Sequence, residues 1–161
     1  MGRTILKGAE VMLFVEGTTI ALATSCSLEV TTQTQDVRTK DSAYGPDKEF
    51  DFCEWSLSSE SLVGENEDAA EQYFAKDLLG LQLAGTPVDV VIGRVSRTSA
   101  SMPAEGWAEP SAVPSDVVLG TYRGKALIMS SSVNAPSEGK TTFSVKLDGL
   151  GELVPVTAAT T

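Results

Sequence analysis

Apolar and polar residues alternate along most of this chain with the period of two that is typical of β-strands. Turn-forming residues separate the alternating runs, such as Glu16-Gly17-Thr18 early in the chain and residues 134–139 near its end. The pattern predicts roughly seven or eight strands in a mainly β fold, a sandwich or barrel-like antiparallel sheet. The expected strands span residues 11–15, 19–23, 23–31, 49–63, 87–95, 116–135 and 140–147.

One segment, residues 66–79, follows the helical period instead. Asn66 is suited to the N-cap position, and Glu67 and Asp68 place negative charge in the first turn. Gly80 lies where a glycine commonly ends a helix. Apolar residues at helical spacing share one side of the segment, so we expect one α-helix packed on the outside of the sheet.

The most unusual stretch runs from Ala23 to Lys48. Its first half alternates small apolar residues with Ser27, Glu29 and Thr31, and it then continues without an apolar residue until Val37. Threonine and glutamine side chains can line a wetted sheet face, but they cannot fill a core. A charged segment follows, so the sequence predicts a long polar hairpin that rests against a partner.

The order of these segments carries a resemblance. A strand A-T-S-C-S-L at residues 23–28 precedes the loop T-Q-D-V-R-T-K-D-S at 34–42 and a strand ending in W-S-L-S at 55–58. The closing motifs are K-A-L-I-M at 125–129, F-S-V at 143–145 and G-L-G-E-L at 149–153. In order and spacing, these motifs make the chain similar to the major tail proteins of long-tailed bacteriophages, from about Gly8 to Leu153.

The resemblance implies a structural virion protein without cofactors. Hexameric rings of the chain would stack into the tail tube, whose inner wall is a continuous β-barrel through which genomic DNA passes without specific binding. Further implied partners are tape-measure, tail-terminator and baseplate or tip proteins. The protein would be assembled in the bacterial cytoplasm and reside in the virion tail. The single domain, residues 1–161, would carry an N-terminal arm at 1–9, a stacking loop at 36–48, a surface loop at 96–115 and a C-terminal arm at 151–161.

Three sets of residues follow from this interpretation. We expect the channel to be lined by the polar side of the long strand and by its partner strand, with Ser27, Glu29, Thr31, Gln33 and Asp51. We expect the stacking loop to use Asp36, Val37, Arg38, Thr39, Lys40, Asp41, Ser42 and Tyr44. The expected core contains Phe14, Leu28, Phe50, Phe52, Phe74, Leu78, Phe143 and Val145.

Composition narrows the function classes. The net charge of −10, from 22 acidic and 12 basic residues, argues against a protein that grips nucleic acid. The chain has no histidine, the commonest general base and metal ligand. It shows no Cys/His spacing for zinc, no glycine-rich phosphate loop and no nucleophile elbow, so we expect neither a catalytic nor a metal site.

The two cysteines, Cys26 and Cys53, fall in expected strands, and we expect small buried hydrophobes rather than a disulfide. No apolar run reaches the roughly 18 residues of a membrane helix, and we identify no signal peptide or membrane anchor. Two alternatives stay open. One is a tube protein of a contractile injection or secretion system or of a gene transfer particle, and the other is a monomeric β-sandwich binding module.

Overall fold

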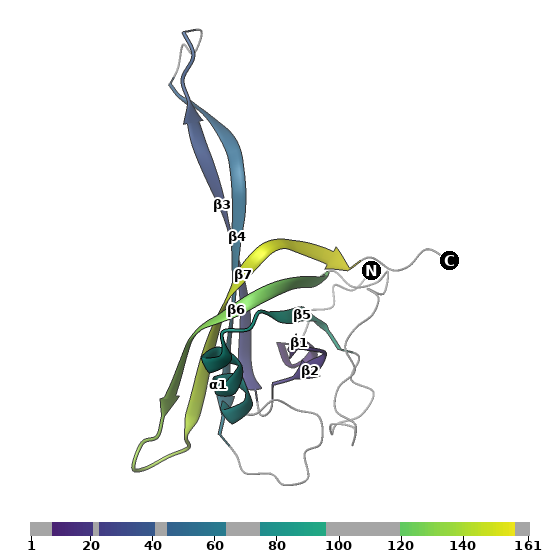
Figure 1. Cartoon of the computed structure of the whole chain (residues 1–161), viewed down its shortest axis with the longest axis vertical. Helices are drawn as coiled ribbons and strands as arrows, with labels where there is room; N and C mark the ends of the chain where they lie inside the picture. The colour runs from purple at the N-terminus through teal and green to yellow at the C-terminus, as the bar shows by residue number, and fades with distance from the viewer. Residues whose placement is uncertain (1–7, 21–22, 41–44, 64–74, 96–119, 157–161) are drawn as a thin grey trace, which may run out of the picture.

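The computed structural model describes residues 8–20, 23–40, 45–63, 75–95 and 120–156. Within these ranges the chain forms seven strands and one α-helix, which confirms the mainly β fold class expected from the sequence (Figure 1). The elements are η1 (Gly8–Glu10, a 3-10 helix), β1 (Val11–Val15), β2 (Thr18–Thr19), β3 (Ala23–Val37), β4 (Asp47–Leu62), α1 (Ala75–Ala84), β5 (Val88–Arg94), β6 (Thr121–Asn134) and β7 (Thr142–Val156).

All seven strands belong to one antiparallel sheet in the order β2-β1-β5-β6-β7-β4-β3. The β6–β7 pairing shifts register between Arg123 and Lys125, where β7 carries Gly151 at a φ of 80°. Such irregularities bend strands. The sheet bends there, so one half containing β1, β2 and β5 folds back over the half built from β3, β4 and the rest of β6 and β7 (Figure 1).

The main core fills the space between the two halves. It takes buried side chains from β1, β4, β5, β6 and β7 and, from the helix, Leu78. Trp55 lies at the bend, where its Nε1 donates a hydrogen bond to the carbonyl oxygen of Gly151 at 3.0 Å. A Cβ atom on Gly124 or Gly149 would come within 3.0 Å of the indole, so these two glycines make room for it.

The expected core residues divide into two groups. Phe14, Leu78, Phe143 and Val145 are buried, and Leu28 packs half-buried against the main core. The expectation for Phe50 and Phe52 is wrong, because their side chains are 63% and 48% exposed. β4 pairs with β7 only from Ser56 onward, so in the described part of the chain residues 47–55 have a neighbouring strand only on the β3 side. Phe74 lies outside the described residues.

The helix ends later than the sequence suggests. α1 continues through Gly80 to Ala84, and Gly85, at a φ of 65°, takes the C-terminal glycine position instead. The last turn is held by packing of Leu81 on the core and by the Gln82 amide, whose Nε2 donates to the carbonyl oxygen of Met129 at 3.4 Å. The expected first turns fall on residues that the structure does not describe. In the described part of the chain, no helix is long and apolar enough to cross a membrane.

The C-terminal arm expected from Gly151 is wrong for residues 151–156. This segment completes β7, with Val154, Pro155 and Val156 opposite Arg123, Tyr122 and Thr121 of β6. The last five residues, residues 1–7 of the expected N-terminal arm and the whole expected surface loop 96–115 lie outside the described ranges.

The two cysteines stay reduced because the sheet keeps them apart. Cys26 lies opposite Ser59 and Cys53 opposite Thr32, so they are six positions apart along the paired strands, or roughly 20 Å. A disulfide needs Cα atoms within about 7 Å. Cys26 is half-buried, and its thiol donates to the carbonyl oxygen of Val11 at 3.6 Å, whereas Cys53 is exposed, contrary to expectation.

Candidate assembly surface

Four neighbouring strands, β6, β7, β4 and β3, share one face that is rich in polar side chains. Residues paired across an antiparallel ladder point to the same side of the sheet. One row across this face runs from Ser27 to Ser58, then to Lys146 and to Ser130. From the polar residues of this face we define the polar wall as the following set: Ser25, Ser27, Glu29, Thr31, Gln33, Glu54, Ser56, Ser58, Glu60, Lys125, Ser130, Ser132, Ser144, Lys146 and Asp148.

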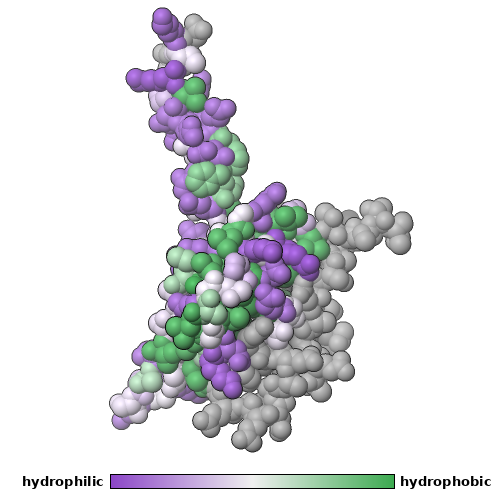
Figure 2. Space-filling view, viewed as in Figure 1, coloured by the Kyte–Doolittle hydropathy of each residue, from purple (hydrophilic) through white to green (hydrophobic). Residues whose placement is uncertain are grey.

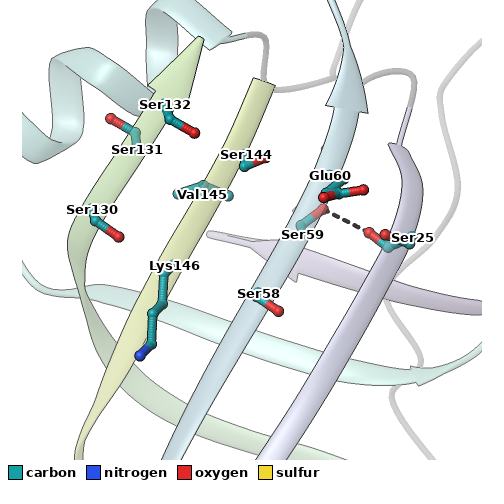
Figure 3. A pocket seen from close by; sticks show the side chains of 10 residues that line it. All are labelled: Ser25, Ser58, Ser59, Glu60, Ser130, Ser131, Ser132, Ser144, Val145 and Lys146. Carbon is teal, nitrogen blue, oxygen red and sulfur yellow. Dashed lines mark hydrogen bonds between the residues drawn. The ribbon is translucent and has the colours of Figure 1, made fainter. Parts of the chain in front are cut away.

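The middle of the polar wall is an open hollow of about 370 Å³ lined by serines of all four strands (Figure 3). Ser27 and Ser58 share a hydrogen bond between their hydroxyl groups, and Ser59 Oγ donates to the carbonyl oxygen of Ser25 at 3.2 Å. Hydroxyl groups both donate and accept hydrogen bonds, so this surface is suited to holding a layer of water. Among the described residues, no group of three or more His, Cys, Asp or Glu side chains could hold a metal ion.

The polar wall is weakly acidic. Its four carboxylates are Glu29, Glu54, Glu60 and Asp148, and its two cations are Lys125 and Lys146, so 2 − 4 gives a net charge of −2 per chain. Opposite charges are interspersed, with no run of cations that could follow a phosphate backbone.

Four of the five residues expected to line a channel lie together on the polar wall. Ser27, Glu29 and Thr31 are exposed, and the half-buried Gln33 donates from Nε2 to Glu54 Oε2 at 3.2 Å. Asp51 is set apart from them. It is exposed but falls at the register shift beside Gln33 and Thr34, and therefore has no partner on β3.

Sequence reasoning missed most of the wall that β4, β6 and β7 contribute. The signals were present in the serine run 130–132 and in the alternation of Thr142, Ser144 and Lys146 with buried residues. Neither signal tells which strands become neighbours. The pairing in the sheet decides that, because it joins strands that are more than 80 residues apart in the chain.

Within the described chain, the polar wall ends on both sides in an open strand edge. β3 is the last strand of the sheet along its whole length. At the other side, β5 pairs with β6 only up to Ala126, so residues 127–134 of β6 have no neighbouring strand there. Exposed edges of this kind are templates for pairing with another chain.

Past the four-stranded part of the sheet, β3 and β4 continue as a two-stranded ribbon, which we define as residues 30–37 and 47–55 (Figure 1). The polar wall extends onto this ribbon through Thr31, Gln33 and Glu54. Figure 2 shows that its surface is mainly hydrophilic with a few apolar side chains. Of the expected stacking residues, Asp36 and Val37 belong to β3, and Arg38, Thr39 and Lys40 follow it. Asp41, Ser42 and Tyr44 lie outside the described residues.

No protein-family model matches this chain, and neither does any curated protein. Solved structures do match it. The tail of an empty gene transfer agent particle, refined with C6 symmetry, aligns with a TM-score of 0.63 at 14% identity, covering 94% of this chain and 98% of the other. The SPP1 tail tube aligns with a TM-score of 0.61 at 11% identity, covering 95% and 80%. The sheath–tube complex of the PVC extracellular contractile injection system aligns with a TM-score of 0.55 at 13% identity, covering 94% and 90%.

At sequence identities of 11–14%, the structural similarity shows a shared fold. The chain has the fold of tail-tube proteins over nearly its whole length, so the resemblance in the sequence extends to the fold. The three structures are tails and tubes, and the fold is thus one used by structural components of phage-like particles.

Proposed function

We propose that the protein is the tail-tube subunit of a bacteriophage or of a related gene transfer particle. Six copies close into a ring by pairing the open edge of β3 with the open edge of β6, and the rings stack into a tube. The polar wall then lines the channel. The observation that carries this proposal is a polar four-stranded wall that ends on both sides in an unpaired edge.

Strand direction supports closure by these two edges. Three antiparallel steps separate β6 from β3, so the two edge strands run in opposite directions. A copy related by rotation about the tube axis therefore places its β6 antiparallel to β3 of its neighbour. The two free stretches also match in length and in position along the tube axis, because residues 23–29 and 127–133 lie on the same rows of the sheet.

The size of such a ring suits a channel. Six copies with four wall strands each give 24 strands. For strands about 4.8 Å apart and tilted by about 40°, the barrel measures about 48 Å between opposite backbones. Barrels of about 16 to 18 strands already enclose an aqueous channel, so a 24-stranded barrel would be wide and water-filled.

The chemistry of the polar wall suits the passage of DNA. With a net charge of −2 per chain, a six-membered ring would present 6 × −2 = −12. Cationic walls would hold phosphates at successive points, whereas this wall repels the backbone over about 8 Å at physiological ionic strength. The serine hydroxyls keep water between wall and duplex. Genomic DNA would pass without specific binding on its way into a host cell.

In this function the protein resides in the tail of the particle after assembly in the bacterial cytoplasm. Its further partners would be tape-measure, tail-terminator and baseplate or tip proteins. The fold also occurs in a contractile injection system, which makes the tube of such a machine the second candidate.

Electron microscopy of the purified protein, with sedimentation over a range of concentrations, tests the proposal. We expect six-fold rings or tubes, and we expect the tubes to retain no DNA at physiological salt. A stable monomer at high concentration would contradict ring formation and favour a monomeric binding module. Tubes that retain DNA would contradict the role in DNA passage.

A further inference from the structure

The ribbon carries apolar side chains that nothing in the described part of the chain covers. Val30 is 52% exposed and Phe50 63% exposed, and before Ser56 the only described strand beside β4 is β3. A two-stranded hairpin alone is at best marginally stable in water, so the ribbon needs a surface to rest on.

The register shift places the two ribbon phenylalanines on opposite faces. Phe52 lies opposite Gln33 and Phe50 opposite Thr34, and consecutive residues of β3 point to opposite sides. Phe52 therefore shares the side of the polar wall. Phe50 shares the other side with Val30, which is the side of the sheet on which the core and α1 lie.

A second exposed apolar surface lies at the opposite end of the molecule, where α1 meets the far part of β6. Its members are Leu83, 88% exposed, Met129, 53% exposed, and Val133, 54% exposed, and we call them the lower apolar patch. Gln82 ties the end of α1 to β6 through the carbonyl oxygen of Met129 and the hydroxyl of Ser131. Figure 1 shows α1 and this end of β6 at the far end of the long axis from the ribbon tip, and Figure 2 shows apolar surface there.

We infer that Phe50 of one copy packs against Leu83 and Val133 of a copy in the next ring. This inference rests on the proposed function, because it assigns the contact by which rings stack. Both surfaces lie on the same side of the sheet and at opposite ends of one chain, so copies repeated along the long axis bring them together. A head-to-tail contact of this kind never closes on itself and can therefore extend a tube without limit.

Substitutions at exposed positions test the contact without disturbing the core. We expect Phe50→Ser and Leu83→Ser each to leave six-fold rings intact and to abolish tubes. Phe52→Ser is the matched control, because it removes the same side chain from the other face of the ribbon, and it should leave tubes. Equal loss of tubes in the Phe50→Ser and Phe52→Ser proteins would overturn the assignment, as would normal tubes in either of the first two variants.

Disulfide trapping then identifies the two sides of the contact. In a Cys53→Ser background, which removes the exposed native thiol, Phe50→Cys and Leu83→Cys are combined and assembled tubes are oxidised. Covalent chains of more than six subunits are expected, lengthening as the tubes lengthen. Phe50→Cys or Leu83→Cys alone in this background, which keeps the half-buried Cys26, should give pairs at most. Chains that stop at six would place the contact within a ring, and tubes that yield no linked chains would refute it. A Cys53→Ser protein that makes neither rings nor tubes would refute the proposed function itself.

Discussion

Gly149→Ala is expected to destabilise the subunit strongly, although it adds only one methyl group. The new Cβ would lie less than 3.0 Å from three atoms of the Trp55 indole. The indole cannot move freely, because it is 5% exposed and its Nε1 is held by the carbonyl oxygen of Gly151 at 3.0 Å.

The magnitude follows from two costs and one gain. Overpacking a core by one methyl costs about 1–3 kcal/mol. Displacing the indole from its hydrogen bond leaves a buried N–H unpaired, at about 1–3 kcal/mol. Alanine also lowers the conformational entropy of the unfolded chain, which stabilises the folded state by about 0.4–1 kcal/mol. Together these terms give a loss of about 1–5.6 kcal/mol, which for a chain of this size lowers the Tm by roughly 2–22 °C.

Urea and thermal unfolding of the free subunit measure this loss, with Gly80→Ala as the matched control. Gly80 lies inside α1 with no atom within 4 Å of the added Cβ, so the same substitution there should stabilise by about 0.5–1 kcal/mol. In a Trp55→Val background the ring is gone, and Gly149→Ala should cost little. A cost that is unchanged in that background, or a neutral Gly149→Ala, would refute the packing argument.

Three further predictions concern the wall, the ribbon and the thiols. Glu29→Lys should leave tubes intact because the side chain is exposed. It brings the net charge of the wall to zero, so these tubes should retain DNA at low salt and deliver it poorly. Unchanged DNA passage would show that Glu29 does not face the channel. Replacing residues 37–47 with Asn-Gly should give folded rings that fail to stack, as seen by microscopy. Burial raises the pKa of the Cys26 thiol, so a thiol reagent at pH 8 should label Cys53 much faster than Cys26; equal rates would contradict the burial.

Much of the fold could be predicted from the alternation of apolar and polar residues in the strands and from the residues in the turns. Val11–Val15 and the turn after it are as expected, since Glu16 and Gly17 both take the positive φ values, 51° and 80°, that a tight hairpin turn requires. The alternation around Phe143 and Val145 likewise identified which side of β7 is buried.

The errors arose where local signals compete with tertiary context. Phe50 and Phe52 were expected in the core because aromatic side chains are usually buried. Nothing local shows that residues 47–55 of β4 lie outside its pairing with β7, which reaches only from Ser56 to Leu62. Gly80 looked like a helix end, but the packing of Leu81 and the hydrogen bonds of Gln82 continue the helix to Ala84. Residues 151–156 looked like a tail because their apolar density is low, yet a bulge at Gly151 redirects them along β6.

The same strands contribute side chains to the core on one face and to the polar wall on the other, so the position of the wall residues depends on the packing of the core. On β7, Phe143, Val145 and Leu147 are buried, while Ser144, Lys146 and Asp148 between them belong to the polar wall. A register slip of one residue would turn every serine of such a strand into the core and every core side chain onto the wall. Serine adds little stability to a strand, so the buried side alone must fix the register. The Trp55 indole, wedged at the bend against Gly124 and Gly149, resists sliding there, and the surface proposed to face DNA thus depends on packing on the far side of the sheet.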